Sequence, residues 1–218
     1  RFTFERFADH VVARAIVENT LVDGQLPDPL PAESLLVNAC SRDGVDWGVR
    51  EALAVQVPER TGAELPDVLS PFEEAETWGL VTPETVRMRA TLELLGEMDG
   101  VDAVRDALVR LSIEPEGPFD AYSLHASLSE KSMPERDGKW SIFVAENGDD
   151  ADDTAYSAIR DLIEWARDVR VGEVEPETAS LAAIALTWCL TTSNRRARDT
   201  ATMGLVSLLA AAPDVVGK

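Results

Sequence analysis

The stretch WCLTTSNRRARDTATMGLVSLL, residues 188–209, decides the fold that we expect for this chain. An apolar helix ends in a short polar turn, and a second helix then opens with an Arg-x-Arg-Asp step and continues with apolar residues at helical spacing. Two helices joined in this way form one layer of a helical solenoid. We therefore expect a mainly α-helical chain, folded as an irregular HEAT-like helical array.

The other apolar segments show the same period, and Pro or Gly separates them. Proline in a first turn, followed by a glutamate that suits the positive end of the helix dipole, marks helix starts at Pro83 and Pro176. Helices are expected at about 6–21, 35–41, 45–57 (with Pro58 near its stop), 83–97, 101–111, 119–130, 154–170, 175–192 and 194–211.

The two proline starts also suggest an internal repeat. Pro-Glu-Thr at 83–85 precedes the Arg-Asp dipeptide at 105–106, and Pro-Glu-Thr at 176–178 precedes Arg-Asp at 198–199 with identical spacing. This spacing favours two stacked helical hairpins of HEAT type. Coincidence is the alternative, because Arg-Asp dipeptides are frequent in this chain.

Two short segments are predicted as strands. RFTFE at 1–5 alternates and is aromatic, and helical spacing follows it, with Phe7, Val11, Val12, Ala15 and Ile16 on one face. A strand that runs into a helix is how a winged-helix module ends. A turn at 132–138 precedes the short apolar stretch WSIFVA, which predicts a second strand at about 140–144.

The same features give the expected domain organisation. We expect the tail of a winged-helix module at 1–21, a linker at 22–34 with three prolines and a glycine, a helical array at 35–130, and HEAT-like layers at 131–218. ENGDDADD at 146–153 is predicted to be an exposed acidic loop.

Composition narrows the classes of function. The net charge of -20 disfavours a nucleic-acid surface, because phosphate contacts need clustered Lys and Arg, and Lys131, Lys139 and Lys218 are the only lysines. No signal peptide and no membrane-spanning apolar run is visible, so we expect neither nucleic acid nor membrane as a partner. We interpret the chain as an excised piece of a larger cytoplasmic protein; a chain processed at its N-terminus is the alternative.

Sequence motifs for catalysis or metal binding are lacking. Gly138-Lys139 has no upstream glycine and is followed by Trp140, so it is not the loop that holds phosphates in ATPases. Four residues of types that bind zinc, His10, His125, Cys40 and Cys189, show no ligand spacing, and we expect the two cysteines to be reduced core thiols. The acidic residues at 149–153 lack the EF-hand pattern. We therefore expect this chain to be no enzyme and to hold no cofactor or metal.

Four blocks, in chain order, carry a resemblance to a known family: RFTFERFADHVVARAI (1–16), EALAVQVPERTGAEL (51–65), MPERDGKWSIFV (133–144) with LIEW (162–165), and the stretch quoted first. Together they resemble the antiviral STAND NTPases of bacteria and archaea, the NACHT-like Avs or AVAST group. Residues 70–81 depart from that family, which is more basic and aromatic there.

The resemblance implies a segment just downstream of the ATPase core, leading to a C-terminal sensor. In that family the sensor binds a phage protein, ADP is exchanged for ATP, protomers oligomerise and an N-terminal effector fires. The chain would then be the helical arm that couples the nucleotide switch to the sensor. Its partners would be its own upstream ATPase domain and, through the parent, a phage protein, while ATP or ADP and Mg would be bound by the parent.

Asp9 and His10 are the candidate nucleotide-sensing residues. The resemblance implies a Met-His-Asp-type motif near the end of the winged-helix domain, whose histidine contacts the phosphate of ADP in the full-length parent. Alternatively, Asp9 pairs with Arg6 or Arg14, and His10 faces solvent.

Arg195, Arg196, Arg198 and Asp199 are the candidate interaction or structural residues. The arginines could receive an acidic partner or a phosphate. In the structural alternative, Asp199 suits the positive end of its helix, Arg195 and Arg196 cover the turn, and Arg198 pairs with an acid at 161, 164 or 168.

Three tryptophans, Trp140, Trp165 and Trp188, are expected in or beside one core shared by the last three helices. Two other functions stay open. One is a self-standing HEAT-like scaffold that binds a protein partner without any link to ATP. The other is an all-helical enzyme whose site is not visible in the sequence.

Overall fold

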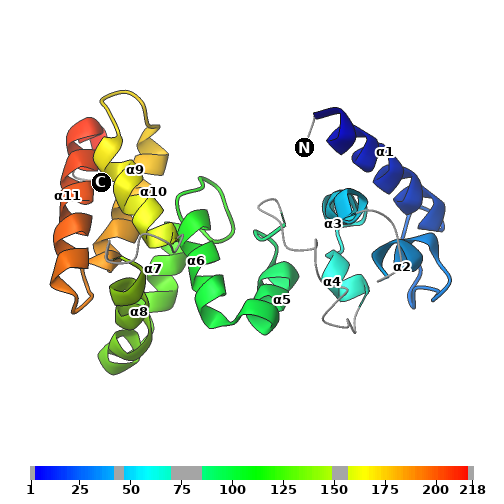
Figure 1. The fold of residues 1–218 in the computed structure, drawn as a ribbon, viewed down its shortest axis with the longest axis horizontal. Helices are drawn as coiled ribbons and strands as arrows, with labels where there is room; N and C mark the ends of the chain where they lie inside the picture. Colours follow the sequence, from blue (N-terminus) through cyan, green and yellow to red (C-terminus); the bar gives the residue numbers. More distant parts are fainter. Residues whose placement is uncertain (1–2, 42–46, 70–84, 149–156, 216–218) are drawn as a thin grey trace. The chain divides into compact units, whose positions relative to one another are not determined.

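The computed structural model describes residues 3–41, 47–69, 85–148 and 157–215. The chain forms two compact units, Arg1–Gly100 and Val101–Lys218. The described residues are mainly helical and contain no β-strand, only one isolated bridge between Val22 and Gln25 (Figure 1). No helix among them has the length and apolar character needed to cross a membrane. The boundary between the units falls inside the expected helical array at 35–130.

The described residues of the first unit form five helices. These are α1 (Thr3–Thr20), α2 (Leu35–Cys40), α3 (Trp47–Thr61), α4 (Leu65–Val68) and α5 (Arg89–Asp99). Helix α1 packs against α3, and the core between them is closed by α2 and α4. Its fully buried members include Val17, Leu36, Leu53, Val57 and Leu65.

The prediction of a strand at 1–5 is wrong, because α1 already begins at Thr3. The alternation covers too few residues, and the described chain offers no strand to share its backbone hydrogen bonds, which are instead made inside the helix. The strand–helix tail of a winged-helix module is therefore not confirmed.

The apolar face expected on α1 coincides only in part with the buried side of the helix. Phe7, Val11 and Val12 are 66%, 50% and 44% exposed, whereas Ala13 and Val17 are fully buried. Helix α3 packs on the side of α1 that carries these two residues, and the half-buried Ile16 joins that core. The position of α3, and not the number of large apolar residues, therefore decides which side of α1 is buried.

Two helix ends in this unit differ from the predictions. Helix α3 passes Pro58 and ends at Thr61, before Gly62 with its φ of 73°. Residues 85–88 form a turn, and α5 begins only at Arg89, while 82–84 lie outside the described residues. Thr85 thus lies in a turn, whereas Thr178 lies inside α10, and the HEAT-like repeat is not confirmed.

A carboxylate from another helix sets the start of α5. Glu64, at the N-cap of α4, accepts hydrogen bonds from the backbone N–H groups of Arg89, Ala90 and Thr91 at 3.1, 2.6 and 3.3 Å. The first N–H groups of a helix have no partner within it, and a carboxylate there also suits the helix dipole. Glu64 therefore fixes where α5 starts.

In the second unit, the part of the chain that the structure describes forms six helices and a short 3-10 helix. They are α6 (Val101–Leu111), α7 (Ala121–Ser129), α8 (Met133–Asn147), α9 (Ala158–Asp168), α10 (Pro176–Cys189), α11 (Arg195–Ala211) and η2 (Pro213–Val215). Helices α9, α10 and α11 lie side by side (Figure 1). The proline start predicted for α10 is confirmed, with Glu175 at its N-cap.

The predicted strand at 140–144 is wrong, because these residues lie in the middle of α8. A capping box formed by Ser132 and Glu135 starts the helix, and Pro134 sits in the first turn, where its missing N–H costs nothing. The turn predicted at 132–138 is thus the first turn of α8 and its continuation. A short apolar run such as WSIFVA does not by itself distinguish a strand from a buried helix segment.

The predicted tryptophan core is confirmed. Trp140 is 4% exposed and belongs to the core of the second unit, while Trp165 and Trp188 are half-buried against it. Helix α11 approaches α9 so closely at Gly204 that an added Cβ would lie 3.2 Å from the Ile163 carbonyl oxygen.

Candidate functional site

The polar turn between α10 and α11 is fastened to α8 by four hydrogen bonds. Trp140 Nε1 donates to the Trp188 carbonyl at 3.0 Å, and Ser141 Oγ donates to the Thr191 carbonyl at 3.2 Å. In return, Thr192 Oγ1 donates to the Ser141 carbonyl at 2.9 Å, and Asn194 Nδ2 donates to the Ala145 carbonyl at 3.1 Å. Two of the family-like blocks, 133–144 and 188–209, therefore contact each other directly.

Asn194 also begins α11, because its side-chain oxygen accepts from the N–H groups of Arg196 and Ala197. Arg198 does not pair with an acid of α9 as predicted. Its Nη1 donates to the Thr192 carbonyl at 2.9 Å. Arg198 is thus a structural residue of its own turn.

One of the three acids predicted as candidate partners of Arg198 is paired with another arginine. Asp161 accepts from Arg110 Nη1 at 2.8 Å, and Arg110 Nε in turn donates to Asp106. Partial burial lowers the pKa of Arg110, but its hydrogen bond to Asp161 and the charges of the two acids outweigh this and raise the pKa above its ordinary value. This pairing joins α6 to α9.

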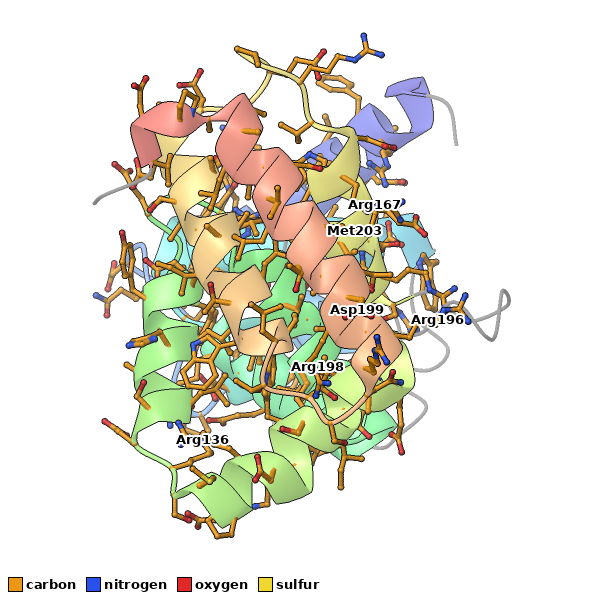
Figure 2. All side chains as sticks on the ribbon, turned by 90° about the vertical axis from the view of Figure 1, so that its left-hand side faces the viewer. Arg136, Arg167, Arg196, Arg198, Asp199 and Met203 are labelled. Carbon is orange, nitrogen blue, oxygen red and sulfur yellow. The ribbon has the colours of Figure 1, made fainter. Side chains whose placement is uncertain are left out.

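The other candidate residues of this turn lie at the surface. Arg195 and Asp199 form an ion pair at 3.5 Å between side chains that are 86% and 66% exposed, which contributes little to stability. Arg196 is exposed and extends away from the first turn of α11, on a different side from Arg198 (Figure 2). The four residues therefore do not converge on one ligand site.

Asp9 and His10 lie on α1, where Asp9 is half-buried and His10 is exposed. The Nδ1 atom of His10 lies 3.4 Å from Nε2 of Gln56 on α3. Arg14, which was expected as an alternative partner of Asp9, donates to Glu18 at 2.7 Å. The contact between His10 and Gln56 brings the family-like blocks 1–16 and 51–65 together where α1 packs against α3.

The cysteines are buried free thiols, as expected of reduced core cysteines. Burial raises the pKa of Cys189 to about 12, so that thiol stays protonated at neutral pH. Among the described residues, no three His, Cys, Asp or Glu side chains come together as a metal site. The acidic residues 149–153 and the divergent segment 70–81 lie outside the described residues.

A cavity of about 290 Å³ lies in the second unit between α6, α7 and α8. Its apolar lining includes Val104, Leu108, Leu124, Leu128 and Trp140, of which Leu128 and Trp140 belong to the core. The polar lining consists of Ser127, four cationic side chains and one acid: Arg105, Lys131, Arg136, Lys139 and Glu135.

These charges contrast with the rest of the chain. Two of its three lysines line this cavity, although acidic residues outnumber basic ones two to one overall. Arg136 lies over the ring of Trp188, with its guanidinium carbon 5.7 Å from the ring centroid. Figure 2 shows Arg136 well away from Arg167 and Met203, so the cavity is separate from the outer face of α9 and α11.

Sequence reasoning missed this cavity. The signal was present, since Lys131, Arg136 and Lys139 fall within nine residues of a chain that is otherwise nearly free of lysine. Arg105 and the apolar lining come from other helices, and only their packing shows that these side chains face one space.

Comparison of the chain with descriptions of known protein families, with curated proteins and with solved structures gave no match.

Proposed function

We propose that this chain is a non-catalytic helical arm of a STAND-type, NACHT-like ATPase of antiphage defence, which couples the nucleotide switch to a C-terminal sensor. The observation that carries the proposal is that the family-like blocks contact one another in each unit. Helix α1, which holds most of block 1–16, packs against α3, which holds most of block 51–65, and block 133–144 is hydrogen-bonded to 188–209. LIEW at 162–165 lies where α9 meets Gly204 of α11.

Packing of the family-like blocks against one another is what we expect of a segment that transmits a conformational change. Resemblance confined to exposed loops would favour a shared ligand, whereas resemblance in packed helices favours a shared mechanical framework. His10 beside Gln56 would then lie next to the upstream ATPase domain of the parent, which would bind ATP or ADP and Mg. The proposed setting is cytoplasmic, with that domain and a phage protein as partners.

The test begins with the reading frame that encodes Arg1. A Gly-rich loop with GK[ST] upstream in the same frame supports the arm. A start codon immediately before Arg1 overturns it. In the encoded protein, Gly204→Leu should abolish protection in a phage plaque assay because it forces α9 and α11 apart, whereas Met203→Leu, an exposed change one residue away, should leave protection intact.

A self-standing helical scaffold is the second candidate, and the cation-lined cavity favours it. A site that takes an acidic protein segment needs no link to ATP. The two candidates differ in one measurement, because only the arm predicts that the complete encoded protein binds ATP. Calorimetry with ATP on that protein separates them.

A further inference from the structure

We propose that the cavity between α6, α7 and α8 binds an acidic segment of a protein partner. One bulky apolar side chain of the segment occupies the cavity, and neighbouring Asp or Glu side chains contact its cationic rim. This site goes beyond the arm function and does not depend on any ATPase, because every residue that lines it belongs to the second unit.

The apolar lining provides the seat. Leu108, Leu124, Leu128 and Trp140 come from three different helices, and the core packing of Leu128 and Trp140 keeps the wall in place. A preformed apolar seat of this kind is where the anchor residue of an interface binds. Transfer of one Leu or Phe side chain from water into it supplies the apolar part of the binding.

The rim provides the charge. Lys139 makes no hydrogen bond or ion pair with any described residue, so its ammonium is available to a ligand. Lys131 donates to the carbonyl and hydroxyl oxygens of Ser127, which leaves one of its three N–H bonds for a further acceptor. Arg136 rests on Trp188 and keeps its N–H donors unused among the described residues.

The nearby acids offset only part of this positive charge. Glu135 accepts from the N–H and hydroxyl of Ser132 at 3.0 and 2.6 Å, and these bonds, together with the charges of Lys139 and Lys131, hold its pKa below the usual value, so that one negative charge stands against the four cations of the lining. Asp102 is paired with Arg105 at 2.5 Å. An incoming carboxylate therefore meets a net positive rim on a protein whose overall charge is -20.

The form of the cavity favours a peptide over a small molecule. Its volume of about 290 Å³ lies just below the roughly 300–1,000 Å³ typical of sites that enclose a small ligand. Val101, Lys131 and Lys139 on its rim are exposed, so a ligand would remain partly outside it. One apolar side chain of a peptide fits inside such an open cavity, while the acidic residues beside it contact the exposed rim.

The test is fluorescence anisotropy with a fluorescein-labelled ten-residue peptide that carries Leu at its centre and Glu and Asp elsewhere. The same peptide with Ala at the centre is the control for the seat. We expect the Leu peptide to bind about tenfold more tightly than the Ala peptide, because a few buried anchor residues supply most of the binding energy of an interface. Its binding should weaken as salt is raised, because the rim is exposed.

Matched variants locate the site. Lys139→Gln should weaken binding of the Leu peptide about threefold, in line with a single exposed charge pair, whereas Arg167→Gln should leave it unchanged. Both variants remove one exposed cation, and Arg167 lies on α9 away from the cavity (Figure 2). Likewise, Val101→Ala should weaken binding, and Met203→Ala, on the outer face of α11, should not.

Five results would overturn the proposal. The Leu peptide fails to bind, the two peptides bind equally, or the two cation variants have equal effects. In the fourth, octanoate displaces the peptide at an equal concentration, which would assign the cavity to small amphiphilic carboxylates. In the fifth, the chain associates with itself and Lys139→Gln abolishes this association. The occupant of the cavity would then be a second copy of the chain and not a partner protein.

Discussion

The indole N–H of Trp140 donates a hydrogen bond to the backbone carbonyl of Trp188, across 48 residues of sequence. The bond ties the middle of α8 to the last turn of α10. The ring of Trp188 in turn lies beside His125 and beneath Arg136. One pair of tryptophans therefore links the core of the second unit to the wall of its cationic cavity.

Trp140→Phe should lower the free energy of unfolding by about 1–2 kcal/mol, because it removes one donor to a partly buried carbonyl while keeping most of the ring. Trp165→Phe is the matched control, since Trp165 packs beside the same core and its indole makes no hydrogen bond to a described residue. Circular dichroism during urea unfolding measures both. Equal losses in the two variants would show that the hydrogen bond is unimportant.

Glu64→Ala should expose the start of α5. Three backbone N–H groups lose their acceptor, and loss of a helix cap costs about 0.5–2 kcal/mol. Hydrogen exchange at Arg89, Ala90 and Thr91 should accelerate, while Glu59→Ala, at an exposed site on α3, should leave these amides unchanged. Unaltered exchange in Glu64→Ala would mean that another group caps the helix.

Arg198→Ala should destabilise the chain by about 1 kcal/mol, because the Thr192 carbonyl loses a charged donor. Arg196→Ala, at an exposed position in the same turn, should change the free energy of unfolding by no more than about 0.5 kcal/mol relative to the unsubstituted chain. Thermal melts compare the two. If defence activity is lost in Arg198→Ala with no change in melting temperature, the residue contacts a partner and the structural role is refuted.

Two glycines in helices should respond to alanine in opposite ways. Gly138 on α8 has open space around its Cβ position, so Gly138→Ala should stabilise by about 0.5–1 kcal/mol through helix propensity. Gly204→Ala should destabilise by about 1 kcal/mol, because the overpacking against Ile163 outweighs that gain. Stabilisation of equal size in both would show that α9 and α11 separate easily.

The thiol of Cys189 should make stability fall at alkaline pH. Folding raises its pKa from 9.0 to about 12, so between these values the unfolded chain loses a proton that the folded chain keeps. The free energy of unfolding therefore falls by about 1.4 kcal/mol per pH unit above 9, and the effect is absent at neutral pH. In Cys189→Ala, the free energy of unfolding should fall less steeply with pH, by this amount per unit. The tyrosines and lysines also titrate in this range, but they are the same in both proteins and do not affect the difference. Identical slopes for parent and variant would contradict the buried neutral thiol.

Local signals in the sequence predicted much of the second unit. Helix α10 starts at its proline as expected, and α11 follows the polar turn whose Asn194 caps it. The three tryptophans reach one core because each lies on the apolar stripe of its helix. These features depend on residues a few positions apart, which is the range that sequence patterns cover.

Features set by packing were missed. The buried face of α1 depends on how closely α3 approaches Ala13 and Val17, and the partner of Arg198 depends on the folding of its own turn. The start of α5 depends on Glu64, far upstream of it. The cavity required three helices to meet. None of these relations has a period or a motif along the chain.

Helix α9, like α5, takes its cap from elsewhere. Ser157 stands at its N-cap without making a side-chain cap bond, and the Ala158 N–H donates to Asp106 of α6 at 2.6 Å. An engineer who cuts the second unit between α8 and α9 would keep every residue of α9 and still remove the acid that starts it. The segment from α9 onward is therefore not an exchangeable module, and grafts or split versions of this protein should carry α6 with α9.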